Sequence, residues 1–322
     1  MEFKLNFHVT ALPAKINYSD KLLLMGSCFA ENIAAELQRN KFNLISNPHG
    51  ILYNPLNISA SIEEYISKKL YSERDLFFGN ERWNSFYHHS RFSDADQTNC
   101  LENINLSIEN AHDQLKEARW LIITFGSAFI YKNKENQIVA NCHKLPQKEF
   151  TKELVPVEEI INAFNEMISK LEIFNPGLNL IFTVSPVRYI RDGIIENNLS
   201  KAILLQAVHQ LTKENPTCFY FPSYEIVNDE LRDYRFFKED LVHPNEMAIQ
   251  YVLEKFVDSA FSDSAKELYQ KIGEILIAKD HRPFNPESEA HKMFRKSYLG
   301  KVKKLQQQNS FLNFDDELNY FS

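Results

Sequence analysis

The stretch from Leu22 to Ala35, LLLMGSCFAENIAA, joins a short apolar run to an amphipathic segment through a single glycine. The apolar run before Gly26 has the composition of a buried strand. Beyond the glycine, apolar residues recur at helical spacing: Phe29, Ile33, Ala34 and Leu37. The stretch therefore predicts a strand, a tight turn and a helix, with Ser27 and Cys28 where the helix begins.

The same alternation of strand and helix continues along the chain. Further strands are predicted at 43–46, 120–125, 178–186 and 218–226, and helices at 57–71, 105–117, 157–174, 197–214 and 245–261. Asn57 or Ser59 is the expected cap of the first of these helices. Strands that alternate with helices favour a parallel sheet covered on both faces. We therefore predict an α/β fold, a flavodoxin-like three-layer sandwich around a mostly parallel five-stranded sheet.

Two parts of the chain depart from this alternation. An aromatic, polar stretch without clear periodicity indicates an insertion at about 72–104, and residues 128–146 have a hairpin-like pattern. After about residue 280 a basic segment precedes an acidic one. We predict a first domain over 1–262 and a helical extension and tail over 263–322, whose charge pattern is typical of a solvated or partner-binding appendage.

Composition limits the classes of partner and the location. The net charge of −7 argues against a dedicated nucleic-acid binder. The sequence has no signal-peptide pattern and no apolar run long enough for a membrane span, so we expect a cytoplasmic protein without a membrane partner. The cysteines form no CxxC pair and are expected to be free thiols: Cys28, Cys100, Cys142 and Cys218.

Ser27 and Cys28 have two interpretations. Serine is a common helix cap, so the pair can serve the turn alone. Alternatively, one of the two is a nucleophile at a helix N-terminus, where the dipole stabilises a thiolate and lowers the pKa of a thiol.

A nucleophile of this kind needs a base, and the base needs a group that orients it. Asp240 and His243 lie three residues apart in DLVH, directly before the helix predicted from residue 245. Such a turn can direct the imidazole toward the nucleophile while the carboxylate holds its other nitrogen. We therefore predict that these two residues complete a catalytic site.

The chain resembles the GSCFA-domain family, which is grouped with the SGNH/GDSL hydrolases. GSCFAENIA at 26–34 carries the resemblance, together with NPHGILYNP, TFGSAFIY, TVSPVRYIRDGIIENNLSKA and DLVHP. In SGNH hydrolases a Gly-Asp-Ser-Leu block follows the first strand, and its Ser attacks an ester carbonyl. When residues 26–29 are aligned with that block, Cys28 takes the position of the nucleophilic Ser and Ser27 takes that of the Asp. Asp240 and His243 match the late Asp-x-x-His block of the same superfamily. We favour Cys28 as the nucleophile and keep Ser27 as the alternative.

The resemblance also implies donors for an oxyanion. Gly50 matches the glycine of the second block, which offers its backbone N–H. The third block, Gly-x-Asn, falls on Gly126, Ser127 and Ala128, so its Asn is missing and Ser127 or Asn141 is the expected substitute. Loss of one such donor typically costs about 100- to 1000-fold in rate, which makes this departure important.

Arg188, Tyr224 and Glu225 follow predicted strands and are candidates for the cleft. Arg188 can bind a substrate carboxylate or phosphate in bidentate fashion, or form a structural ion pair with the acidic segment 228–234. His143 is either a structural histidine or a substrate-binding residue.

A metal site is a further alternative. Its ligands would come from Cys28, His88, His89, Cys142 and His143, but their spacing matches no familiar zinc pattern. We expect neither a metal nor another cofactor.

These features favour an SGNH-like esterase or acyltransferase that acts on a small-molecule or carbohydrate acyl ester. A non-catalytic ligand-binding or accessory protein on the same fold is the alternative, and a metal-dependent hydrolase is the third. The oligomeric state is left open.

Overall fold

A computed structural model of the protein describes residues 5–322, except for the side chain of Asp192. Five parallel strands form the central sheet in the order β10-β9-β5-β1-β2. They are β1 (Leu22–Gly26), β2 (Leu44–Ser46), β5 (Trp120–Phe125), β9 (Asn179–Val184) and β10 (Cys218–Tyr220). Counted among themselves, these strands have the order 2-1-3-4-5 of flavodoxin-like folds, which confirms the predicted fold class.

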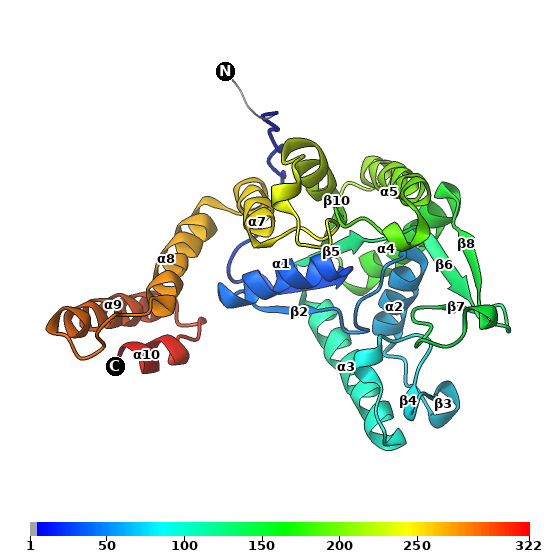
Figure 1. The fold of residues 1–322 in the computed structure, drawn as a ribbon, viewed down its shortest axis with the longest axis horizontal. Coiled ribbons are helices and arrows are strands. Elements are labelled where there is room, and N and C mark those ends of the chain that lie inside the picture. The colour runs from blue at the N-terminus through cyan, green and yellow to red at the C-terminus, as the bar shows by residue number, and fades with distance from the viewer. Residues whose placement is uncertain (1–4) are drawn as a thin grey trace.

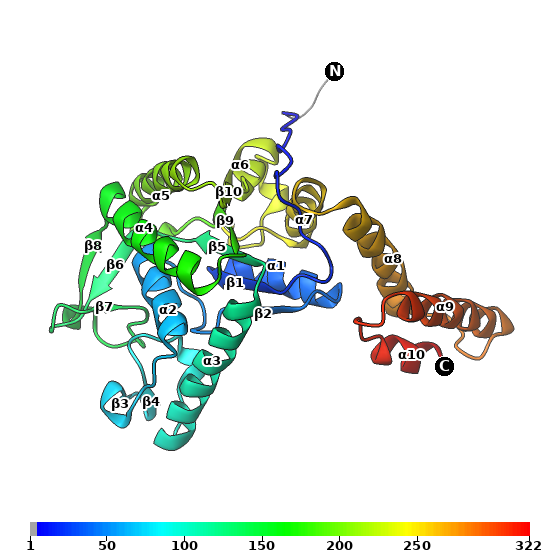
Figure 2. The same cartoon turned by 180° about the vertical axis from the view of Figure 1, so that it is seen from behind.

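Helices cover both faces of this sheet. α1 (Cys28–Arg39) and α7 (Glu246–Ala260) lie on one face (Figures 1 and 2). The other face carries α2 (Pro55–Ser67), α3 (Gln97–Glu117), α4 (Val157–Phe174) and α5 (Ile194–Glu214). Alternate residues of β1 enter the two cores, Leu22 and Leu24 on the α1 side and Leu23 and Met25 on the other. This alternation is what a strand buried on both faces requires.

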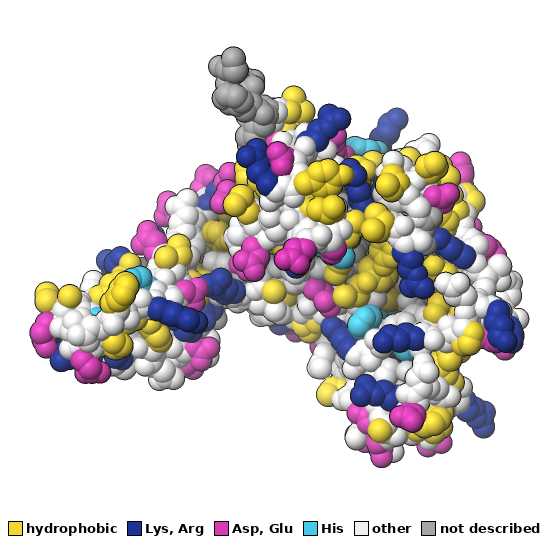
Figure 3. Space-filling model, in the orientation of Figure 1, with side chains coloured by type: hydrophobic (Ala, Val, Ile, Leu, Met, Phe, Trp, Pro, Cys, Tyr) yellow, Lys and Arg dark blue, Asp and Glu magenta, His cyan; other side chains and the backbone are white. Residues whose placement is uncertain are grey.

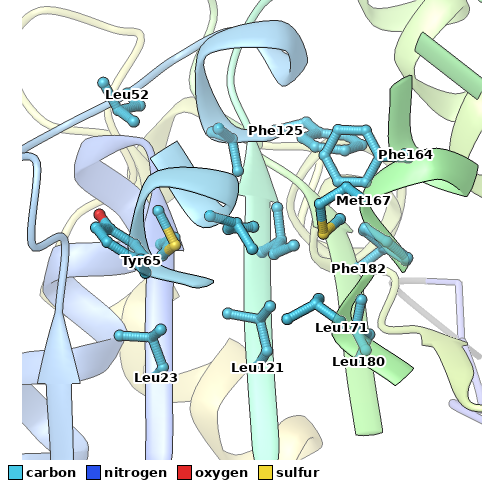
Figure 4. Close-up of a cluster of buried hydrophobic side chains, with 14 of the residues drawn as sticks. Leu23, Leu52, Tyr65, Leu121, Phe125, Phe164, Met167, Leu171, Leu180 and Phe182 are labelled. Carbon is cyan, nitrogen blue, oxygen red and sulfur yellow. The ribbon is translucent and has the colours of Figure 1, made fainter. Parts of the chain in front are cut away.

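Figure 4 shows the core on the α2–α5 side. Leu23, Leu121 and Leu180 lie side by side on three adjacent strands. Above them, the rings of Phe125 and Phe164 meet edge to face with centroids 5.0 Å apart. Such packing fixes the carboxyl ends of β5 and β9, where the loops that matter for function begin.

Two small sheets and several short helices extend the sandwich. β3 (Phe77–Gly79) and β4 (Arg82–Asn84) form a hairpin, and β6 (Phe129–Lys132), β7 (Ile138–Val139) and β8 (Thr151–Leu154) form an antiparallel sheet. The short helices are η1 (Glu73–Asp75), η2 (Ser90–Phe92), η3 (Gln147–Glu149), η4 (Ile190–Asp192), α6 (Ser223–Glu225), the π-helical η5 (Ile226–Glu230) and η6 (Tyr234–Phe236).

Several predicted boundaries were wrong. The second helix is capped by Asn54, whose side chain accepts from the amide of Asn57, rather than by Asn57 or Ser59. Helix α3 begins at Gln97 because Asp96 caps it, so the irregular part of the predicted insertion is shorter than 72–104. The fifth strand ends at Tyr220, since α6 and η5 follow instead of strand.

The C-terminal helices form an arm that projects from the sandwich (Figures 1 and 3). The arm comprises α8 (Asp263–Asp280), α9 (Glu289–Gln308) and α10 (Asp315–Phe321). The carboxylate of Glu317 in α10 lies buried between the ammonium groups of Lys41 and Lys279, at 2.8 and 3.0 Å. The acidic end is therefore a packed helix and not a solvated tail. Among the described helices, none combines the length and apolar character that a membrane span needs.

Candidate active site

A cavity of about 240 Å³ opens at the carboxyl ends of β1, β5 and β9. It is lined by Ser27, Cys28, Tyr53, Gly126, Ser185, Val187, Arg188, Tyr189, Ile190, Arg191, Val242 and His243. Ser27, Gly126 and Ser185 each directly follow one of these strands. Open α/β sheets bind ligands at this edge, so the cavity is where the fold itself places a site.

A glycine makes the turn between β1 and α1 possible. Gly26 has a φ of +128°, and a Cβ there would meet the carbonyl oxygen of Thr124 at 2.1 Å. The side chain of Asn47 accepts the Gly26 amide at 2.7 Å and fixes the turn. Only glycine fits this position, and the turn delivers the next two residues to the cavity.

Ser27 occupies the N-cap position of α1, but its side chain makes no capping hydrogen bond. Its hydroxyl is buried and has no hydrogen-bond partner among the described residues. The interpretation of Ser27 as an ordinary side-chain cap is therefore wrong. Its backbone carries the turn instead, because the Ser27 carbonyl accepts from the Ala30 amide at 2.9 Å.

Cys28 is the first residue of α1, and its half-buried thiol faces the cavity. Burial raises the pKa of this thiol, and the charge of Glu31 adds to the rise. Hydrogen bonds from the amides of Phe29 and Cys28 favour the thiolate but do not outweigh burial. The expectation of a lowered pKa is therefore wrong, because desolvation exceeds the contribution of the helix terminus.

Asp240 and His243 form the predicted pair. The Nδ1 atom of His243 lies 2.6 Å from Oδ2 of Asp240, and the other oxygen of Asp240 accepts the amides of Val242 and His243 at 3.0 Å each. The amide of His243 is the largest of the causes that lower the pKa of Asp240 to about 2, followed by the amide of Val242 and the His243 side chain. The carboxylate thus stays charged and holds one ring nitrogen, and the imidazole lines the cavity.

Three of the predicted oxyanion residues lie outside the cavity lining: Gly50, Ser127 and Asn141. The amide of Gly50 donates to the Asn47 carbonyl at 2.7 Å and is not free for a substrate. The hydroxyl of Ser127 contacts Ser200 at 3.3 Å and accepts the Phe129 amide. The side chain of Asn141 accepts the His143 amide at 2.8 Å. Of this group, only Gly126 faces the cavity.

Other sequence candidates hold structure together elsewhere. His143 is buried, with Nε2 2.8 Å from the Ser85 carbonyl, and burial lowers its pKa. Glu225 accepts from the hydroxyl of Tyr220, and neither Tyr224 nor Glu225 is among the described residues of the lining. Over residues 5–322, no group of three His, Cys, Asp or Glu side chains is placed to hold a metal ion. The proposed metal ligands thus form no such group.

Lys201 is a residue that the sequence interpretation missed. It is buried on α5, and its ammonium donates to the carbonyls of Gly126 at 2.6 Å and Ser185 at 2.7 Å, which belong to the cavity-lining loops after β5 and β9. Desolvation lowers its pKa to about 7, and the charge of Cys28 opposes this. A signal was present, because Asn197, Lys201 and Leu204 share one helix face and Leu204 is a core position.

Tyr53 was missed as well. Its carbonyl accepts the amides of Gly126 and Ser127 at 2.8 and 2.9 Å, and its ring lines the cavity. Burial raises the pKa of its phenol, a hydrogen bond with Tyr189 opposes this, and the charge of Cys28 is close enough to act on it. Sequence spacing gave no signal for Tyr53, because its contact with Gly126 and Ser127 depends on how the loop after β2 packs against the loop after β5.

Comparisons with known proteins agree with the motif at β1. A model of the GSCFA family matches residues 21–256, and a model described as the GSCFA domain protein, C-terminal domain matches residues 272–322. No curated protein matches the chain.

One solved structure with a similar fold is an acetyl xylan esterase, Est2A, from the rumen bacterium Butyrivibrio proteoclasticus, with 11% sequence identity and a TM-score of 0.36. The match covers 80% of this chain and 66% of that one. Because the family model spans most of the sandwich, including Cys28 and His243, the family assignment follows from it: this chain belongs to the GSCFA family.

Proposed function

We propose that the protein is an acyl hydrolase (an esterase) or an acyltransferase, with Cys28 as nucleophile, His243 as base and Asp240 as the group that orients the base. One observation supports this above all others. A thiol at a helix N-terminus and an imidazole held at Nδ1 by a carboxylate line the same cavity, at the edge of the sheet where α/β folds bind ligands.

The reaction uses side chains of this chain alone. The sulfur of Cys28 attacks the ester carbonyl carbon while Nε2 of His243 takes the thiol proton. The tetrahedral intermediate collapses to a thioester on Cys28, and His243 returns the proton to the departing alcohol. Water, deprotonated by His243, then attacks the thioester, and the acid leaves as His243 returns the proton to the sulfur of Cys28. If an acceptor alcohol takes the place of water, the acyl group is transferred.

The raised pKa of Cys28 determines how the nucleophile is activated. A thiol that stays protonated at rest cannot form a standing thiolate–imidazolium pair. His243 must therefore remove the proton as the sulfur attacks, as in serine hydrolases. The free enzyme is then a weak nucleophile toward reagents that do not occupy the cavity.

The oxyanion needs donors other than Gly50. The amides of Cys28 and Phe29 already point at the sulfur, which places the first of them beside a carbonyl under attack. Tyr53 lines the same cavity and carries an O–H that is a hydrogen-bond donor below its raised pKa. In this proposal the Cys28 amide and the Tyr53 hydroxyl replace the donors that the Gly-x-Asn block lacks.

Hydrolysis of a panel of activated and sugar acyl esters by the full chain tests the proposal. We expect turnover that falls by at least about 1000-fold in Cys28→Ala and His243→Ala, because each removes a group the chemistry uses. Cys142→Ala is the matched control, since that thiol is also half-buried and free but lies outside the cavity lining. Activity that survives in Cys28→Ala and disappears in Ser27→Ala would assign the nucleophile to Ser27.

A non-catalytic ligand-binding or accessory protein is the second candidate. The half-buried thiol with a raised pKa and the occupied amide of Gly50 favour it. It predicts that no ester of the panel is turned over and that ligand binding in the cavity is the same in Cys28→Ala as in the native chain.

A further inference from the structure

Two arginines enter the cavity from the loop after β9. Arg188 and Arg191 both line it, together with Cys28 and His243. A protein with a net charge of −7 thus places two positive side chains around one small cavity. Positive charge gathered in a concave site attracts anionic ligands.

Among the described residues, Arg188 forms no ion pair. The guanidinium is half-buried, and its Nε atom is fully buried without a hydrogen-bond partner among the described residues. Arg295, the other half-buried arginine, also has a buried Nε atom without a partner among the described residues, but another of its nitrogens donates to the main-chain oxygen of Ser322. A buried donor without a partner is costly, so the native ligand of Arg188 is expected to supply the acceptor.

The structural alternative for Arg188 was an ion pair with the acidic segment 228–234. Two of the three acids are used elsewhere: Glu230 lies 3.3 Å from the ammonium of Lys255, and Asp233 lies 3.6 Å from Arg235. The third, Asp229, forms no ion pair with Arg188, although the charges of both act on Tyr224. No ion pair or hydrogen bond joins Arg188 to any side chain of the described chain. The guanidinium is therefore available to a ligand.

We propose that Arg188, with Arg191 beside it, binds a carboxylate or phosphate group of the substrate. Guanidinium groups bind both anions through paired N–H donors, and a side-on contact through Nε would satisfy the unpartnered atom. A cavity of about 240 Å³ fits a small molecule, so the substrate is a small anionic acyl compound. The acyl part of this statement rests on the proposed function, but the anion site does not depend on turnover.

Binding is measured by isothermal titration calorimetry on the full chain carrying Cys28→Ala, which removes turnover. The probes are phenyl phosphate and succinate, with benzyl alcohol and succinamide as neutral controls. We expect at least one anion to bind, neither neutral control to bind, and Arg188→Gln to weaken the anion about tenfold or more. Arg188→Lys keeps the charge but loses the paired N–H donors, so its affinity for the anion is expected to lie between those of the parent chain and Arg188→Gln.

Arg282→Gln is the matched control, since it removes the same charge from an exposed side chain outside the cavity lining. The proposal is overturned if neither anion binds at concentrations up to about 10 mM, which would detect even a weak millimolar site. It is also overturned if Arg188→Gln and Arg282→Gln bind the anion equally well. Tighter binding of phenyl phosphate identifies a phosphate, and tighter binding of succinate identifies a carboxylate. Anion binding without ester turnover would contradict the proposed function but support the anion site.

A kinetic comparison gives a second measurement. The ratio of kcat/KM for mono-p-nitrophenyl succinate to that for p-nitrophenyl acetate compares an anionic with a neutral acyl group. We expect Arg188→Gln to lower this ratio about tenfold or more, while Arg282→Gln leaves it as in the native chain. An equal ratio in both variants would contradict a role of Arg188 toward the acyl group.

Discussion

Cys28 combines two opposing influences within one residue. The amides at the start of α1 favour its thiolate, whereas burial and the charge of Glu31 disfavour it, and burial is the larger effect. In the proposed mechanism such a thiol is activated only when His243 removes its proton during attack. The resting thiol and the reacting thiol would then differ in reactivity.

This predicts the pH profile of Cys28 alkylation in the free protein. The rate constant for iodoacetamide should rise with an inflection above about 8.5, the usual cysteine value, because burial raises the pKa of the thiol. Peptide mapping by mass spectrometry follows Cys28 separately from the other cysteines, and glutathione is the reference thiol. An inflection below pH 7 would show a preformed thiolate and contradict the activation proposed here.

Gly26 is the residue on which the turn depends. Gly26→Ala should lower the free energy of unfolding by about 2–4 kcal/mol or prevent folding, because it combines a positive φ with contact at 2.1 Å to a backbone oxygen. Denaturant unfolding measures this. Gly273→Ala is the control, since nothing described lies within 4 Å of its Cβ position and the change should add about 0.5–1 kcal/mol within a helix. Equal stability of the two variants would contradict the strained turn.

At the scale of elements, Lys201 ties α5 to the loops after β5 and β9. Its pKa of about 7 in the folded chain lies below its ordinary value of 10.5. Between these values the unfolded chain holds a proton that the folded chain has lost. The contribution of Lys201 to the unfolding free energy must therefore rise as the pH increases from about 7 to 10.5.

Lys201→Met removes this contribution. From pH 6.5 to pH 8.5 the native chain should gain about 1–2 kcal/mol of unfolding free energy relative to the variant, from a lysine that titrates near pH 7. Denaturant titrations at both pH values measure the change. Lys213→Met is the control, as that lysine is exposed on the same helix and should show no such difference. A difference in unfolding free energy between the native chain and Lys201→Met that is the same at both pH values would show that Lys201 stays charged when buried.

The elements of the sandwich could be predicted because their signals are local. The run at 120–125 matches β5 residue for residue, and Asn245 caps α7 where the pattern placed it. Boundaries set by a single side chain were missed, as with the Asn54 and Asp96 caps. In the site, the turn at Gly26 and the Asp240–His243 pair could also be predicted, because their signals lie within a few residues of one another. Tyr53, Lys201 and the occupied amide of Gly50 depend on contacts between distant segments, which no spacing encodes.

At the scale of the whole molecule, the arm of α8, α9 and α10 is held to the sandwich near α1. Arg39 pairs with Asp280, and Glu317 lies between Lys41 and Lys279. The acidic side chain is buried while both lysines are partly exposed. Burial alone would raise the pKa of Glu317, but its hydrogen bonds with Lys41 and Lys279 prevail and lower it. Its stabilising contribution is therefore present above the unfolded pKa and is lost as the pH falls through the folded one.

Glu317→Gln should loosen the arm without disturbing the cavity. We expect faster amide hydrogen exchange in α10 and an unfolding free energy lower by about 1–3 kcal/mol, since two lysines lose a buried partner. Glu289→Gln is the control, because its pair with Lys292 is exposed and should contribute less than about 1 kcal/mol. Exchange in α10 that is equal in both variants would show that apolar packing alone holds the arm.

The most direct test of the account is to identify the atom that carries the acyl group. Native protein is mixed with an activated ester, quenched in acid within milliseconds to seconds, and mapped by peptide mass spectrometry. We predict that the acyl mass is added to Cys28. The adduct should accumulate more slowly in His243→Ala and should be absent in Cys28→Ala. An acyl group on Ser27, or steady hydrolysis with no adduct on the peptide that contains both residues, would contradict the assignment of Cys28 as the nucleophile.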